Sequence, residues 1–146
     1  MERLLSSSGL CKALQYTEPN FLDRPDVVDP SELIMEKIFP YLRVPGTEEE
    51  ASTYILLQLR NYRPTKKGGV FKSGIINIYA ITHKDLIVTD YGMLRHDYMV
   101  TEIEKLMNNQ RGIGIGKLEF FQMDDVAFIN NEYIGNVLSY KPYEWN

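Results

Sequence analysis

The sequence predicts an α+β fold: a mainly antiparallel four-stranded sheet with a long projecting β-hairpin, packed against one main amphipathic helix and a shorter N-terminal helix. Apolar side chains alternate over residues 53–62 and 75–82, the period of a half-buried strand, and they alternate again over 117–122. Over residues 94–110 apolar residues instead recur at spacings of three and four, which is typical of an amphipathic helix. With 146 residues, the chain is expected to form a single α+β domain over residues 31–146.

The first 30 residues are expected to form an N-terminal arm or linker that is partly extended. A short helix over residues 2–16 is interrupted by the run from Ser6 to Gly9, and residues 17–30 contain three prolines among aspartates. This composition offers few apolar side chains to bury within one chain. We therefore expect the segment to become ordered against a partner.

The shorter helix is predicted to begin after this arm, over residues 31–39. Asp29 or Ser31 is suited to cap its free amides, and Pro30 is tolerated in a first turn. Pro40 ends the predicted helix, and a turn at Pro45 leads to the first strand.

The two strands that follow are predicted to form the projecting hairpin. Ile55, Leu57 and Leu59 share one face of the first strand, residues 53–62. The connection over residues 63–73 contains a proline and two glycines, so it is too long and flexible for a two-residue turn. In the second strand, residues 70–82, Ile78 and Ala80 are predicted to share a face.

The main helix is predicted to carry one apolar stripe and one polar face. Thr89 or Asp90 is expected to cap it, and Arg95 is expected on the solvated face. The stripe consists of Leu94, Tyr98, Met99, Ile103, Leu106 and Met107. A third strand over residues 117–129, bent at Asp124 and Asp125, and a fourth over residues 133–140 complete the predicted sheet.

Charge is distributed unevenly along the chain. The net charge is -4, yet residues 51–84 contain six Lys or Arg residues and no carboxylate. Five of these lie in what we call the basic hairpin, residues 60–72: Arg60, Arg63, Lys66, Lys67 and Lys72. An acidic loop precedes the first strand and consists of Glu48, Glu49 and Glu50.

The residues of the basic hairpin and of the acidic loop are predicted to be subunit or partner contacts, because a basic segment in an acidic molecule suits docking against an acidic neighbour. A solvated hairpin tip is the alternative.

No catalytic, metal or cofactor site is expected. His83 and His96 have no set of further ligands at workable spacing, and Cys11 is the only cysteine. The glycine-rich run of residues 112–116 follows a helix and precedes a strand, the reverse of the order in a phosphate-binding loop. The chain has no apolar run of about 18 residues and no signal-peptide pattern at its start, so we expect a cytoplasmic site of synthesis.

A nucleic-acid-binding or metal-dependent nuclease domain is the alternative from a different functional class. It would use the basic hairpin for phosphate contacts, with Asp85, Asp90 and Glu119 as metal ligands and Lys117 beside them. The acidic composition, with a sequence pI near 5.2, weighs against a protein whose main role is to grip DNA.

The order of elements over residues 32–144 carries a family resemblance. Three elements carry this resemblance: the strand at residues 76–81, the helix that opens at Leu94 and Arg95, and the closing strand at residues 133–140. In the order of its helices and strands, the chain resembles the tail terminator and tail-to-head joining proteins of tailed bacteriophages, which are structural proteins of the viral neck.

The resemblance implies a virion protein that forms a homo-hexameric ring at the head-tail interface. Its expected partners are itself, the tail tube protein and a head-completion or neck protein. DNA would pass through the lumen without specific binding, and no catalysis is implied. Another neck component, such as a head-closure or connector protein, remains an alternative within the same class.

Overall fold

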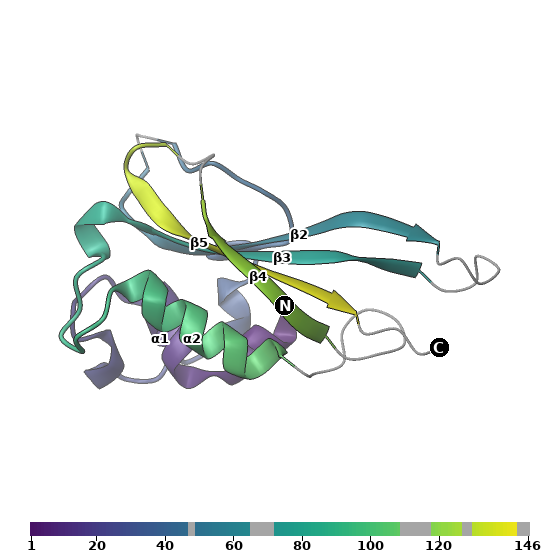
Figure 1. Ribbon diagram of the computed structural model, residues 1–146. Coiled ribbons are helices and arrows are strands. Elements are labelled where there is room, and N and C mark those ends of the chain that lie inside the picture. The colour runs from purple at the N-terminus through teal and green to yellow at the C-terminus, as the bar shows by residue number, and fades with distance from the viewer. Residues whose placement is uncertain (47–48, 65–71, 109–117, 127–129, 143–146) are drawn as a thin grey trace.

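The structure is a computed structural model that describes residues 1–46, 49–64, 72–108, 118–126 and 130–142 (Figure 1). It confirms the α+β class. The helices and strands are α1 (Ser8–Gln15), β1 (Ile38–Phe39), β2 (Thr53–Pro64), β3 (Lys72–His83), α2 (Arg95–Met107), β4 (Leu118–Asp125) and β5 (Tyr133–Pro142). None of the described helices is long and apolar enough to cross a membrane.

The sheet is mixed and has five strands in the order β1-β2-β3-β5-β4, which corrects the predicted four-stranded sheet. The extra strand is β1, which pairs parallel to β2 through Ile38 with Ile55 and Phe39 with Leu56. The other neighbouring strands pair antiparallel. The mainly antiparallel character that the alternation indicated is therefore present, with one short parallel addition at the edge.

The helix predicted over residues 31–39 is wrong. Only a 3₁₀ turn, Pro30–Leu33, forms there, and Asp29 caps it by accepting a hydrogen bond from the amide of Ser31 at 3.1 Å. Met35 then adopts a left-handed conformation with φ 69°, which interrupts any helix. Phe39 precedes Pro40, and a residue before proline favours extended backbone, so this part of the chain joins the sheet instead.

The β2–β3 hairpin extends beyond the rest of the sheet (Figure 1). Its register runs from Thr53 opposite Thr82 to Pro64 opposite Lys72, with an irregularity between Arg60 and Arg63. Strand β5 pairs with β3 only from Ile76 onward, so the distal end of the hairpin lies outside the β3–β5 pairing. The connection at residues 65–71 lies outside the described residues.

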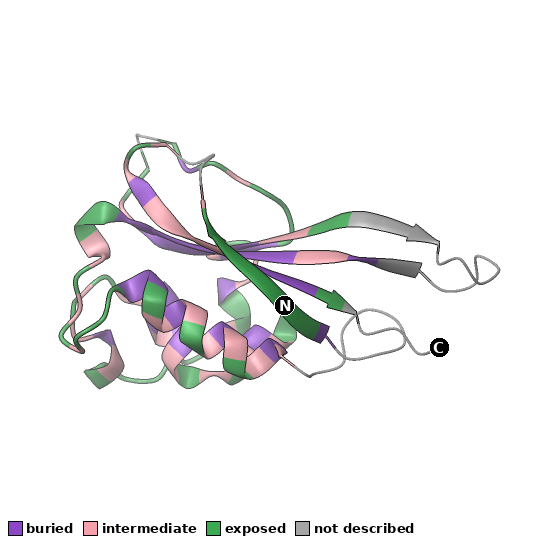
Figure 2. Ribbon diagram, in the orientation of Figure 1, coloured by how far each residue is buried: buried purple, intermediate pink, exposed green. Residues whose placement is uncertain are grey.

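Both helices lie on one side of the sheet and form the main core with it (Figures 1 and 2). From α2, Met99 and Ile103 are fully buried against strand residues that include Ile55 and Ile78. The opposite face has a smaller apolar cluster made from Phe39, Tyr54, Leu56, Tyr79, Ile81 and Tyr133. The strand alternation thus buries side chains on both faces.

Arg95, the first residue of α2, is fully buried, so the prediction that it faces solvent is wrong. Its guanidinium is satisfied by main-chain carbonyl oxygens, those of Ala13, Tyr16, Thr17, Glu18 and Leu86. Burial lowers the pKa of Arg95. Neither predicted cap is used, because Leu94 occupies the N-cap position of α2 without a side-chain hydrogen bond.

The segment expected to be an arm, residues 1–30, packs in the same core as the sheet. Leu4, Leu10 and Phe21 are fully buried there. Helix α1 begins after Ser7, whose side chain accepts a hydrogen bond from the amide of Leu10 at 3.1 Å. Its apolar face turns toward α2 and the strands, which is how a short helix gains stability that it lacks alone.

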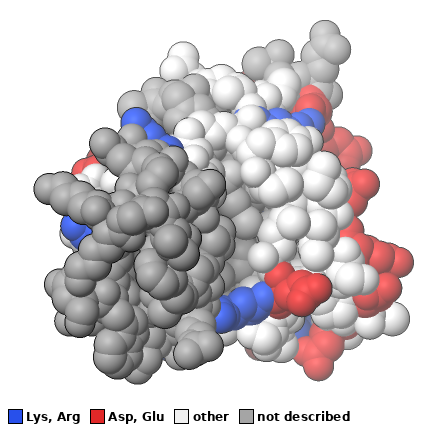
Figure 3. Space-filling model, turned by 90° about the vertical axis from the view of Figure 1, so that its right-hand side faces the viewer, with Lys and Arg blue, Asp and Glu red and all other residues white. Residues whose placement is uncertain are grey.

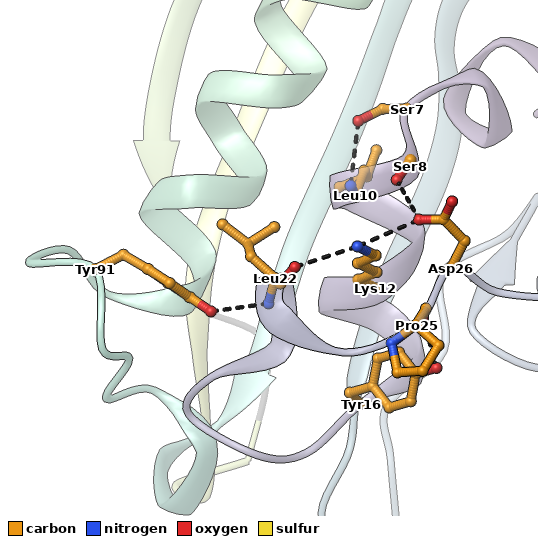
Figure 4. A network of polar contacts seen from close by, with 9 residues as sticks. All are labelled: Ser7, Ser8, Leu10, Lys12, Tyr16, Leu22, Pro25, Asp26 and Tyr91. Carbon is orange, nitrogen blue, oxygen red and sulfur yellow. Dashed lines mark hydrogen bonds and ion pairs between the residues drawn. The ribbon is translucent and has the colours of Figure 1, made fainter.

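Polar contacts then tie residues 16–26 to α1 and to Tyr91, which precedes α2 (Figure 4). Lys12 of α1 donates to the carbonyl of Leu22 at 3.2 Å and forms an ion pair with Asp26 at 3.2 Å. The amide of Leu22 donates to the hydroxyl of Tyr91 at 3.0 Å, and the hydroxyl of Tyr16 donates to the carbonyl of Pro25 at 2.7 Å. Residues without regular structure are thereby held against the domain.

Candidate interaction surface

The basic hairpin is only partly within the described residues. Arg60, on β2, is exposed, and its side chain has no hydrogen bond or ion pair to any described residue. Arg63 and Lys72 lie within the backbone bounds of β2 and β3. Lys66 and Lys67 lie outside the described residues. The strands therefore carry part of this positive charge away from the body of the domain.

The acidic loop is partly engaged within its own chain. Glu48 lies outside the described residues, and Glu50 is exposed. Glu49 accepts a hydrogen bond from Arg43 at 2.5 Å and another from the Tyr54 hydroxyl at 3.4 Å. Glu50 forms no ion pair or side-chain hydrogen bond with another described residue, although it lies within electrostatic range of Lys37, so it is the described member more accessible to another subunit.

The described acidic residues and the basic hairpin lie at opposite ends of β2. Glu49 and Glu50 come shortly before the strand begins at Thr53, whereas its other end is Pro64. A strand rises about 3.3 Å per residue, so roughly 35 Å separates the two ends. One chain cannot bring these charges together, but two neighbouring chains can.

Strand β4 forms the other edge of the sheet and is exposed along almost its whole length (Figure 2). Only Leu118 is buried. Three apolar side chains are substantially exposed, namely Phe120 (37%), Phe121 (37%) and Met123 (49%). Sequence reasoning placed a strand here but did not identify this surface; the signal was a run of aromatic and acidic residues with no consistently buried partner face.

Two of the exposed apolar side chains of β4, Phe120 and Phe121, contact neighbouring residues. The Phe120 ring packs edge-on against Tyr140 at 5.7 Å between centroids, and its amide donates to the side-chain oxygen of Asn108 at 3.2 Å. The Lys141 ammonium lies 5.0 Å from the centroid of the Phe121 ring. These contacts present the aromatic groups in fixed positions, which suits recognition.

An apolar row crosses the sheet on the side that holds the helices. Cross-strand pairing joins Leu59 to Ile76, Ile76 to Tyr140, and Tyr140 to Phe120. Tyr140 is fully buried, whereas the end members Leu59 and Phe120 are 45% and 37% exposed. The row therefore ends in exposed apolar groups on both the hairpin and β4.

The view from the hairpin end shows how charge is arranged around these surfaces (Figure 3). Asp and Glu side chains gather along one margin, and uncharged side chains cover a broad area beside them. Separate charged and uncharged areas on one face suit contact with another macromolecule.

The residues considered for metal chemistry are not assembled into a site among those described. No group of three or more His, Cys, Asp or Glu side chains in the described ranges is placed to hold a metal ion. Asp85 lies in a 3₁₀ turn, Lys84–Leu86, and Glu119 lies on β4 opposite Lys141. Lys117 and the glycine-rich run of residues 112–116 lie outside the described residues.

The two histidines occupy different environments. His83 lies between two carboxylates, with Nδ1 3.6 Å from Asp85 and Nε2 3.5 Å from Glu132. His96 is buried at the start of α2, its Nδ1 has no hydrogen-bond partner among the described residues, and burial lowers its pKa. Cys11 is also buried, and burial raises the pKa of its thiol. A raised thiol pKa reduces the reactive thiolate form.

Comparison with known proteins identifies one family. The family model described as YomW matches residues 7–142, which is nearly the whole chain and includes α1 as well as the sheet. No curated protein and no solved structure matches this chain.

Proposed function

This chain belongs to the YomW family, a family of the Bacillus phage SPbeta region that indicates a phage-associated protein, and on that premise we propose that it is a structural protein of the virion. It forms a homo-hexameric ring at the head-tail interface, in the role of a tail terminator or tail-to-head joining protein. The tail tube protein binds one side of the ring, and a head-completion or neck protein binds the other.

One observation carries the proposal: surfaces of opposite charge lie at opposite ends of the same hairpin. Arg60 has no partner among the described residues at one end, and Glu50 is exposed at the other. Contacts between different surfaces of identical subunits are head-to-tail, and they generate a closed ring when the rotation between subunits closes. Complementary charge favours the correct pairing of such surfaces.

The lumen of the ring is expected to be acidic, so that DNA passes without specific binding. The net charge of -4 supports this, since like charge between protein and phosphate opposes binding. A ring whose inner wall is basic would contradict this part of the proposal, as would DNA retention that weakens steeply as salt is raised.

Light scattering of the purified chain tests the proposed ring. The wild-type mass is expected near six times the subunit mass of 17.0 kDa, and Lys66→Glu with Lys67→Glu is expected to lower it. Lys84→Glu with Lys105→Glu makes the same total change in charge outside the basic hairpin and is expected to leave the mass unchanged. A wild-type mass of one subunit at every concentration would contradict a ring that closes without a partner.

A further inference from the structure

The outer edge of β4 is unpaired within the described residues. Strand β4 pairs with β5 on one side, and within the described residues its other side has no strand beside it. The amide of Phe120 is bonded to Asn108, which covers one backbone group near the start of this edge. Natural proteins normally cover a long edge that carries apolar side chains, because it otherwise pairs with another strand.

The side chains of β4 indicate which kind of strand it would accept. Glu119, Asp124 and Asp125 place three carboxylates on eight residues that contain no Lys or Arg. Phe120 and Met123 are exposed among these acids. Such a surface favours an extended partner that combines positive charge with apolar side chains.

The outer edge of distal β2 has that chemistry. Its pairing with β1 ends at Leu56, so within the described residues 57–64 have β3 on one side and no strand on the other. This stretch matches β4 in length. It contains Leu59, which is 45% exposed, together with Arg60 and Arg63, and no carboxylate.

The two edges cannot pair within one chain. Strands β3 and β5 lie between β2 and β4 in the sheet, which places β2 and β4 about 14 Å apart where they run side by side. The hairpin also extends away from the body of the domain (Figure 1). The strand that reaches β4 must therefore come from a second copy.

We propose that the β4 edge binds the distal β2 edge, residues 57–64, of a second copy of this chain, so that the two sheets become continuous. This inference rests on the proposed ring and names its subunit contact. The exposed Phe120 and Met123 then cover Leu59 of the neighbour, while Asp124 and Asp125 face Arg60 of the neighbour. Glu50 belongs to the acidic loop and not to the β4 edge, so its contact with a neighbour and the β4 contact are tested by separate substitutions.

Charge exchange between the two edges tests the contact by light scattering. Asp124→Lys with Asp125→Lys, and separately Arg60→Glu with Arg63→Glu, are each expected to raise the subunit dissociation constant at least about tenfold. The four changes combined in one chain are expected to restore assembly, because each edge again meets the opposite charge. Glu32→Lys, which reverses one charge at an exposed residue of the 3₁₀ turn Pro30–Leu33, serves as the control and is expected to leave the mass unchanged.

The outcomes separate this inference from the proposed ring. An oligomer that survives the β4 changes but is lost with Glu50→Lys would overturn the β4 contact and leave the ring intact. A wild-type chain that stays monomeric at all concentrations would overturn binding of a second copy, whereas a ring that needs its tail partner would survive. Assembly through β4 into an open filament would instead support the contact and overturn the closed ring.

Hydrogen exchange of the wild-type chain gives a second readout that does not depend on whether a variant folds. Amides in residues 118–125 and 57–64 are expected to gain protection together as concentration and mass rise. A rise in mass without added protection in 118–125 would overturn the proposal.

Discussion

Arg95 on α2 places its guanidinium carbon 4.5 Å from the centroid of the Phe21 ring, in the segment between α1 and β1. The same group donates five hydrogen bonds, every one to a main-chain carbonyl oxygen. Two of the acceptors, Ala13 and Tyr16, belong to the C-terminal end of α1, where a helix dipole favours a cation. One buried cation therefore joins the N-terminal segment to the main helix.

Replacing this cation should weaken the whole domain. Arg95→Met keeps an unbranched side chain but leaves buried carbonyl oxygens without donors, so we expect the free energy of unfolding to fall by at least about 3 kcal/mol. Urea unfolding followed by circular dichroism measures it. Arg24→Met removes an exposed arginine from its ion pair with Glu18 and should shift the midpoint little. Equal effects of the two substitutions would contradict the role assigned to Arg95.

Gly135 is required because β3 and β5 approach closely at this position. A Cβ atom at Gly135 would lie 1.9 Å from the carbonyl oxygen of Ala80 and 2.9 Å from the Cα of Ile81. Gly135→Ala is therefore expected to lower the free energy of unfolding by about 1–3 kcal/mol, since both atoms are backbone. In Gly46→Ala the nearest atom, on Glu49, is 3.8 Å away, so thermal unfolding should be nearly unchanged. A stable Gly135→Ala protein would argue against this strand register.

Tyr140 supports the apolar row that ends at Phe120. It is fully buried, and its hydroxyl donates to a carboxylate oxygen of Glu104 at 2.5 Å, while burial raises its pKa. Tyr140→Phe leaves the carboxylate without this donor and should cost about 1–3 kcal/mol of unfolding free energy. Glu104→Gln keeps an acceptor at the same place and should cost less. The reverse ranking in denaturant titrations would contradict the assigned bond.

The stability of the domain should fall on mild acidification because of His96. Its folded-state pKa is lowered, first by burial, while the nearby Asp97 and Asp125 oppose the shift. A lowered pKa means that the unfolded chain binds the proton more readily than the folded chain does. The stability gained by keeping His96 neutral is therefore fully present above about pH 6.5 and is lost as the pH falls below that value. His96→Leu should flatten the dependence of unfolding free energy on pH between 7 and 5. If the slope of unfolding free energy against pH is the same in His96→Leu, the pH dependence arises from other titrating groups.

Much of the fold was predictable because strands and amphipathic helices each impose a period on the apolar residues of the sequence. Alternation located β2, β3, β4 and β5, since each strand places successive side chains on opposite faces. The stripe through Met99 and Ile103 located α2 for the same reason. Strand β1 was missed because Ile38 and Phe39 are too short a run to show a period, and its parallel pairing depends on distant residues.

The remaining differences arise from contacts between distant parts of the chain. The sequence predicts that Arg95 is on the surface, because the groups that accept its hydrogen bonds are main-chain carbonyls, and no pattern of side chains reveals them. The charge of the basic hairpin could be read directly from the sequence. The exposure of Phe120 and Met123 could not, since it follows from the place of β4 at the edge of the strand order.

Counting copies of this chain in purified particles of the phage that encodes it tests the central claim most directly. Quantitative mass spectrometry, calibrated against the other virion proteins, should find about six copies in each particle, and antibody labelling in electron micrographs should place them at the head-tail junction. Purified particles that lack the chain, while infected cells contain it, would contradict a structural role in the virion.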